Sequence, residues 1–209
     1  MESLIQTLSW ISTALQVPVV VAILYLLARG LLALGDCYGR WSDRLRRARG
    51  TGALASVPAA ELLDTLERAI PRKTDALSQA LAALRQAPAD AAWHDRVVTE
   101  FELATDRRLA LLRTMTRIGP LLGLMGTLIP LGPALVALAA GDIAVLARKM
   151  EVAFATTVVG LVIGAIGFLL HQAAQRWAMD DLSLLEFVSA RLQGAKQGAE
   201  QGTGRENVA

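Results

Sequence analysis

The sequence predicts an all-α integral membrane protein with three transmembrane helices and long cytoplasmic helical extensions. Three observations favour this class. The 209-residue chain is 54% hydrophobic. Only 19% of its residues are charged, whereas about a quarter are charged in a typical soluble domain. The apolar residues of the chain gather in three uncharged runs. The mean hydropathy of +0.42 agrees with these features. No strand pattern and no internal repeat competes with the helical periodicity.

The first run covers residues 3–28 and is polar in its first half and strongly apolar in its second. We place a first span from about residue 13 to residue 34, with Arg29 near its inner end, where a long cationic side chain can snorkel to the interface. A cleaved signal peptide is the competing interpretation. A signal peptide has a positively charged region before its apolar run and a small-residue cleavage site after it, and this sequence shows neither feature convincingly. Residues 1–36 are therefore assigned to an outer N-terminus and the first span.

The second and third runs are each long enough to cross a bilayer. Residues 118–140 form a stretch of 23 residues without a charge, and residues 152–170 form one of 19. The longer stretch makes about 34 Å of helix, against a hydrocarbon core of about 30 Å. We predict transmembrane helices over residues 117–140 and 152–171, joined by a short outer connector of residues 141–151.

Basic residues set the expected orientation in the membrane. Residues 37–117 carry most of the Lys and Arg, with a cluster between Arg40 and Arg49, whereas the connector has only Arg148 and Lys149. By the positive-inside rule, the N-terminus lies outside and the C-terminus is cytoplasmic, in a cytoplasmic (inner) membrane. The run from Arg44 to Arg49 is interpreted as an anchor for lipid headgroups and not as a nucleic-acid site. The single cysteine, Cys37, excludes an intrachain disulfide framework.

The cytoplasmic segments show helical signals. In residues 37–116, a helix is predicted to start near Ser56 and to end at Pro71, and a second covers residues 71–86. The next proline after residue 90 is Pro120, so one helix is expected to run into the second span. A helical pattern continues over residues 172–193 after the third span. The glycine- and glutamine-rich residues 194–209 are predicted to be a disordered tail.

Glycines are frequent in the second and third spans. Gly123 and Gly126 share nearly one helix face, and Gly160 and Gly164 form a GxxxG pattern. Membrane helices in general are richer in glycine and proline than soluble ones, which is the alternative explanation. The density in the second span favours a packed face in an oligomer.

Residues 118–140 and 152–170, which make up nearly all of these two spans, contain no Asp, Glu, Lys, Arg or His. A self-contained proton relay or ion carrier needs an ionisable group at depth, so any such group must come from another chain. The third span does contain Thr156 and Thr157. Threonines in membrane helices most often bond back to a carbonyl of their own helix, and that interpretation remains open here.

Two short motifs resemble those of the MotA/TolQ/ExbB proton-channel family. The sequence PLLGLMGT, which ends at Thr127, resembles the family's P-x-x-G-L-x-G-T signature, and ATTVVGL, which contains Thr157, resembles its A-T-x-x-G-L element. The resemblance covers roughly residues 90–190. The three-span layout with an outer N-terminus is similar to the ExbB/TolQ branch, from which Pro130 and Pro133 depart.

The resemblance implies an assembly and a mechanism. Members of the family form homopentamers around the single-span helices of an ExbD/TolR/MotB-like partner dimer, whose membrane aspartate is alternately protonated and deprotonated as protons flow inward. Residues that match Thr127 and Thr157 line the pore, and Thr156 is a further candidate beside them. Some members of the family have a glutamate five residues before the threonine of the last span, which corresponds to Thr157 here. That position is Val152 here, and Glu151, one residue earlier, is either functional or an interfacial charge paired with Arg148 or Lys149.

Other function classes have less support in the sequence. We expect no enzyme, no cofactor and no metal site, because His94 and His171 lie far apart and no nucleophile motif or phosphate-binding loop is present. Asp180, Asp181 and Glu186 are interpreted as a solvated face. The main alternative to a proton-driven energy transducer is a non-conducting membrane scaffold that packs through the same glycines. We expect membrane lipid, further copies of the chain and the single-span protein as partners.

Overall fold

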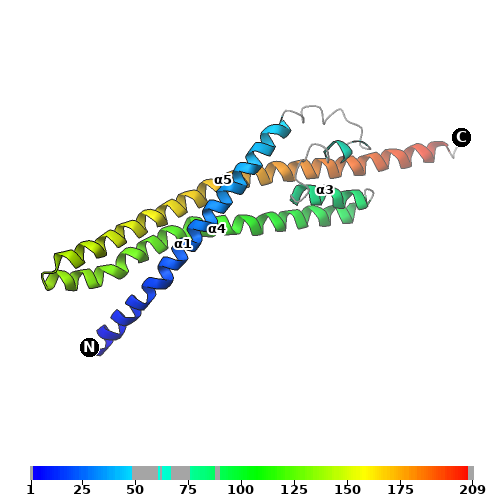
Figure 1. Ribbon diagram of the computed structural model, residues 1–209. Helices are drawn as coiled ribbons and strands as arrows, with labels where there is room; N and C mark the ends of the chain where they lie inside the picture. Colours follow the sequence, from blue (N-terminus) through cyan, green and yellow to red (C-terminus); the bar gives the residue numbers. More distant parts are fainter. Residues whose placement is uncertain (1, 49–60, 62, 67–75, 88–89, 207–209) are drawn as a thin grey trace. The chain divides into compact units, whose positions relative to one another are not determined.

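The computed structural model describes residues 2–48, 61, 63–66, 76–87 and 90–206, and these are almost entirely helical (Figure 1). The helices with defined bounds in these residues are α1 (Glu2–Ala48), α3 (Ala76–Gln86), α4 (Ala91–Ala139) and α5 (Ile143–Glu206), of which α3 is short. Three helical stretches are long and apolar enough to cross a membrane, namely Ala14–Leu45, Ala91–Ala139 and Ile143–Ala195. The predicted all-helical class, with three helices able to span a membrane, is confirmed for the described residues.

The chain divides into two compact units that alternate along the sequence. We call the first the membrane unit, which consists of Met1–Asp36 and Ala110–Gln172, and the second the charged unit, which consists of Cys37–Leu109 and Ala173–Ala209. Helices α4 and α5 contribute to both units, whereas α3 belongs to the charged unit alone. The three uncharged runs of the sequence all fall in the membrane unit.

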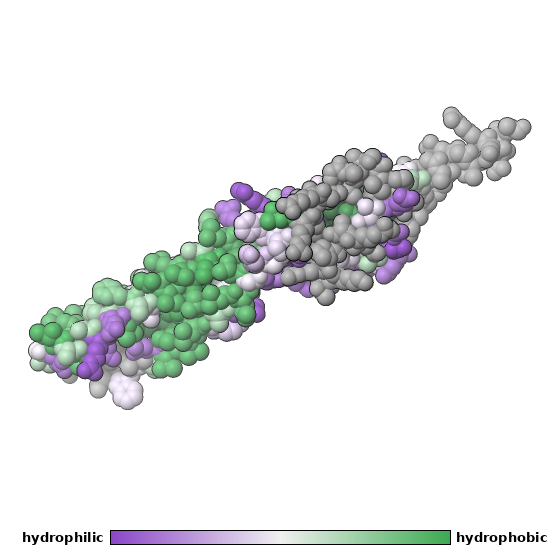
Figure 2. Space-filling model, turned by 45° about the horizontal axis from the view of Figure 1, so that its top comes forward, coloured by the Kyte–Doolittle hydropathy of each residue, from purple (hydrophilic) through white to green (hydrophobic). Residues whose placement is uncertain are grey.

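In the membrane unit, α4 and α5 run antiparallel and side by side, and α1 packs against them (Figure 1). Val19 and Ile23 of α1 are buried, and a Cβ atom on Gly30 would lie 2.9 Å from the Cε atom of Met115 on α4. Many large apolar side chains stay exposed, among them Val136, Phe154 and Leu169, and Figure 2 shows hydrophobic side chains across the visible face of this unit. Such a surface suits lipid or another membrane helix rather than water.

A tight turn joins α4 to α5. Gly141 adopts φ +76°, and its N–H donates to the Leu138 carbonyl while the Asp142 N–H donates to the Ala137 carbonyl, at 3.0 and 2.9 Å. This is the Schellman pattern, in which a left-handed residue closes the helix end. The Asp142 carboxylate then accepts from the Val145 N–H at 3.0 Å and caps α5. The structure therefore starts α5 at Ile143, whereas the sequence suggests a connector as far as residue 151.

We expect the substitution Gly141→Ala to lower the free energy of unfolding of the membrane unit by about 1–2 kcal/mol. A β-carbon disfavours the left-handed conformation that this turn requires, and the side chain has open space, so strain in the backbone is the only cost. Unfolding in detergent, followed by circular dichroism, measures the change. Gly35→Ala is the control, because it sits in a helix with no atom close to its Cβ position. Equal stability of the two variants would contradict the left-handed turn.

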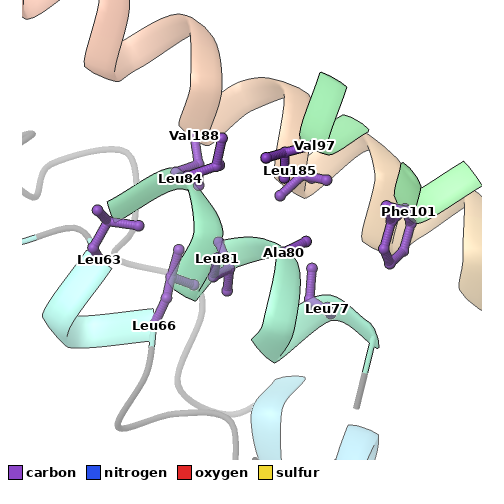
Figure 3. Close-up of a cluster of buried hydrophobic side chains, with 10 residues drawn as sticks. All are labelled: Leu63, Leu66, Leu77, Ala80, Leu81, Leu84, Val97, Phe101, Leu185 and Val188. Atoms are coloured by element: carbon purple, nitrogen blue, oxygen red, sulfur yellow. The ribbon is translucent and has the colours of Figure 1, made fainter. Parts of the chain in front are cut away.

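The charged unit is held together by an apolar core (Figure 3). Leu77, Leu81 and Leu84 lie on one face of α3, at the spacing of one helix turn, and each is essentially inaccessible to solvent. They pack with buried residues of the segment before α3, of α4 and of α5. These are Leu63, Leu66, Val97, Phe101, Leu185 and Val188. Helix α3 is thus fixed by its apolar stripe to α4 and α5.

The ends of several elements differ from the sequence expectations. The short helix expected over residues 71–86 appears as α3 from Ala76, and the expected helix start near Ser56 lies outside the described residues. Helix α5 continues to Glu206 through the glycine-rich residues, where the sequence suggests a disordered tail from residue 194. Helix α4 begins at Ala91, where the Asp90 carboxylate accepts from the N–H groups of Ala92 and Trp93.

Candidate ion-pathway site

Three hydroxyl groups are the only polar side chains in the uncharged stretches of α4 and α5. Residues 118–140 contain Thr127, and residues 152–170 contain Thr156 and Thr157. All three are partly buried within the chain. The backbone contacts described next place Thr156 and Thr157 beside the part of α4 that carries Thr127.

Glycines allow the backbones of α4 and α5 to touch along this region. A Cβ atom on Gly160 would lie 2.6 Å from the Cα atom of Gly123, and one on Gly119 would lie 2.9 Å from the backbone nitrogen of Gly164. Real Cβ atoms do not approach other atoms so closely, so each of these positions requires glycine. We call this contact the glycine seam. The sequence suggests an oligomer face for these glycines, whereas the structure uses them for packing within one chain.

The seam also determines where two of the threonines lie. A Cβ atom on Gly126 would lie 2.5 Å from the hydroxyl oxygen of Thr156, so Thr156 fills the notch that this glycine leaves. Thr157 is 3.5 Å from the carbonyl oxygen of Gly123. Thr156 is therefore a packing residue between α4 and α5 in the single chain. Thr127 stands next to Gly126 in the sequence and is on the same stretch of α4.

Each threonine hydroxyl donates a hydrogen bond to its own helix. Thr127 donates to the Leu124 carbonyl at 2.7 Å, Thr156 to the Ala153 carbonyl at 2.9 Å, and Thr157 to the Ala153 carbonyl at 3.2 Å. This is the back-bonded geometry that threonines commonly adopt in helices. The oxygen lone pairs of each hydroxyl group remain available, so each of the three groups can accept a hydrogen bond from a protonated group of a partner.

Glu151 lies on α5, about two turns after the helix start. Its side chain is exposed, and among the described residues it forms neither an ion pair nor a hydrogen bond. The pairing with Arg148 or Lys149 considered from the sequence is absent from this part of the chain. Glu151 is separated from Thr157 by more than one helix turn of α5.

Sequence reasoning missed an ionic contact in the charged unit, which we call the Arg44 clamp. Arg44 at the end of α1 forms ion pairs with Asp180 and Asp181 of α5, donates a 2.7 Å hydrogen bond to the Trp177 carbonyl, and stacks on the Trp177 ring at 5.5 Å. The side chains of Arg44 and Asp181 are each 21% exposed. Arg44 therefore binds other residues of the protein and not lipid headgroups. Asp180 and Asp181 are ion-paired and do not form a merely solvated face.

We expect Arg44→Met to lower the free energy of unfolding of the charged unit by about 1–3 kcal/mol, because two carboxylates lose a half-buried partner. Thermal unfolding of the purified chain tests this. Arg96→Met is the matched control. Arg96 pairs with Glu100 on an exposed helix face, where such a pair contributes about 0.5 kcal/mol. If both variants were equally stable, the clamp would contribute nothing beyond a surface ion pair.

A second polar contact is buried in the charged unit. The His94 ring is inaccessible to solvent, and its Nδ1 atom lies 2.9 Å from the hydroxyl oxygen of Ser189 on α5. In the part of the chain that the structure describes, no group of His, Cys, Asp or Glu side chains is arranged to hold a metal ion. His94 therefore joins α4 to α5 through Ser189 and through Gln193, which is 3.3 Å from the same nitrogen.

Comparison with known proteins adds one match. The model of the MotA/TolQ/ExbB proton channel family matches residues 55–186, which is more than half of the chain and includes the glycine seam and all three threonines. No curated protein matches the sequence.

Proposed function

Because the chain belongs to the MotA/TolQ/ExbB proton channel family, we propose that it is the channel-forming subunit of a complex that converts proton motive force into mechanical work across a cell envelope. The supporting observation is the α4–α5 pair. It is uncharged over residues 118–140 and 152–170, packed backbone to backbone, and polar only at Thr127, Thr156 and Thr157. Hydroxyl groups can donate and accept hydrogen bonds along an ion path that has no ionisable groups of its own.

The titrating group in this proposal belongs to a partner. An ExbD/TolR/MotB-like protein with one membrane helix and a membrane aspartate supplies the carboxyl group, and five copies of the present chain surround a partner dimer. One charge that crosses 100 mV releases about 2.3 kcal/mol, which is the energy available for each proton. Threonine hydroxyls suit this task because they hydrogen-bond the carboxyl in both protonation states, whereas a lysine would hold it ionised.

The three threonines have different roles in this proposal because their contacts in the single chain differ. Thr127 and Thr157 face the partner's carboxyl group in the assembly, whereas Thr156, which fills the notch at Gly126, supports the α4–α5 packing behind them. We also propose a cytoplasmic (inner) membrane location, with the N-terminus outside and the C-terminus in the cytoplasm. The excess of basic residues between residues 37 and 117 supports this orientation.

We expect Thr157→Val to lower proton flux through the assembled complex about threefold to tenfold, because one neutral hydrogen bond to the moving proton is lost. The measurement is pH-dye fluorescence in liposomes that contain the chain together with a candidate single-span partner that carries a membrane aspartate. Thr114→Val is the matched control. Thr114 is an exposed, back-bonded threonine of the same unit that lies before the uncharged stretch.

The assembly itself is tested by co-purification with that partner and by subunit counting. Normal assembly with reduced flux in Thr157→Val supports the proposal. Full flux in both Thr127→Val and Thr157→Val would remove the pore-lining role. A complex that assembles but conducts no protons with any partner would be a scaffold, and the back-bonded threonines would then be ordinary packing residues.

A further inference from the structure

A cavity of about 90 Å³ lies inside the charged unit, at the place where residues of α1, α3, α4 and α5 come together. It is partly open. Apolar residues line one part of it, including Leu77, Phe101 and Leu109. The polar part of the lining comes from three of the helices and consists of Arg40, Thr105, Arg108, Trp177 and Asp181. The proposed ion pathway uses none of these residues.

The charge of the lining favours an anion. Arg40 and Arg108 bring two positive charges and Asp181 one negative charge, which leaves a formal charge of +1 for the lining; all three residues also interact with other residues of the chain. The Asp181 carboxylate is also ion-paired with Arg44, so the negative charge at the cavity is shared with a third guanidinium group. Guanidinium groups are the side chains best suited to bind the oxygens of phosphate and carboxylate.

Two neutral donors at the cavity have no hydrogen-bond partner within the residues that the structure describes. They are the hydroxyl group of Thr105 and the indole N–H of Trp177. Comparable groups elsewhere are satisfied: Thr99, earlier on the same helix, donates to the Asp95 carbonyl, and the Trp93 indole donates to the Ala83 carbonyl. Neither donor atom is among the fully buried unpartnered atoms, so both are accessible and can donate to a ligand that enters the cavity.

The volume limits the size of the group that enters. A cavity of about 150 Å³ accommodates benzene, so a space of about 90 Å³ accepts a tetrahedral oxyanion but not an aromatic base or a packed acyl chain. A phosphate group offers several acceptor oxygens in different directions. This matches donors that come from α1, α4 and α5 better than a planar carboxylate does.

We propose that this cavity binds the phosphate group of an anionic ligand, supplied either by an anionic membrane phospholipid or by free inorganic phosphate. Arg40 and Arg108 hold the charge, and Thr105 and Trp177 donate to the remaining oxygens. Because the lining includes four helices, an occupied site stabilises the folded charged unit through the linkage of binding to folding. This site is independent of the proposed ion pathway, so either idea can fail without the other.

The test measures binding to the delipidated full-length chain in detergent. One arm adds mixed micelles that contain phosphatidylglycerol or, for comparison, zwitterionic phosphatidylcholine, and the other adds sodium phosphate against sodium chloride at equal ionic strength. Thermal unfolding and native mass spectrometry provide the readouts. We expect saturable binding of phosphatidylglycerol or of inorganic phosphate, and the arm that responds identifies the source. Saturable binding in neither arm, or equal binding of phosphatidylcholine, overturns the proposal.

Neighbouring residues on α4 provide matched variants. We expect Arg108→Gln to weaken binding at least about tenfold, because a charge-assisted contact is lost. Arg107→Gln is expected to leave binding unchanged, since Arg107 is an exposed neighbour outside the cavity lining. An equal loss in both variants would mean that the anion responds only to the general positive charge, which contradicts a built site.

A second pair of variants covers the case in which Arg108→Gln does not fold. Thr105→Val removes only the hydroxyl at nearly constant shape and is expected to weaken binding about threefold or more. Thr99→Val makes the same change at an exposed, already bonded threonine of the same helix and is expected to have no effect. Wild-type affinity in Thr105→Val overturns the site as proposed, and circular dichroism confirms that each variant is folded.

Discussion

Gly160→Val is expected to disrupt the α4–α5 pair and to lower the free energy of unfolding of the membrane unit by at least about 3 kcal/mol, at the upper end of the cost of overpacking. Even the first added carbon would lie 2.6 Å from the Cα atom of Gly123 and 2.7 Å from the carbonyl oxygen of Gly119. Both obstacles are backbone atoms that cannot rotate away, so the helices must separate. Unfolding of the chain in a detergent titration provides the measurement.

Gly132→Val is the matched control for this change. Gly132 lies on α4 in the same unit, and no atom lies within 4 Å of its Cβ position. The same side chain added there meets open space, so we expect a change below about 1 kcal/mol, mainly from helix propensity. Equal stability of Gly132→Val and Gly160→Val would show that α4 and α5 do not touch at the glycine seam.

Leu81→Ala is expected to lower the free energy of unfolding of the charged unit by about 2–5 kcal/mol. The Leu81 side chain is inaccessible to solvent and lies in the middle of the core that α3 forms with α4 and α5 (Figure 3). Its truncation leaves a cavity beneath a helix of only 11 residues, which depends on packing for its stability. Hydrogen exchange of peptides from α3 measures the loss of protection.

Gln79→Ala provides the comparison on the same helix. Gln79 is exposed, and alanine favours helix formation, so exchange in α3 should stay the same or slow slightly. The difference between the two variants isolates the buried contact from the propensity of the helix. Unchanged protection in Leu81→Ala would contradict the core of the charged unit.

The three spans could be predicted from the sequence because length and lack of charge are sufficient to define them. Residues 118–140 and 152–170 can cross a bilayer as helices whatever they pack against, and the structure places them in α4 and α5. The start of α5 was harder to place from hydropathy. The polar residues after residue 140 suggest a connector, but the Gly141 turn and the Asp142 cap begin the helix directly after it.

Contacts between residues far apart in the sequence could not be predicted in this way. Arg44 belongs to a run of basic residues, and only the folded chain brings it to Asp180, 136 residues later. The glycines were visible as a pattern, but their partners depend on the rotation of α5 about its own axis relative to α4, which the spacing does not determine. In the same way, the threonines were found through a family resemblance, whereas the role of Thr156 as a packing residue came from Gly126.

The glycine seam also restricts how the protein can move while it works. Backbones in direct contact leave no side chains that could change rotamer and let one helix slide along the other. We therefore expect α4 and α5 to move together along the glycine seam. On the proposed function, rotation or sliding that accompanies ion flow is expected at the boundaries of this pair and not between α4 and α5.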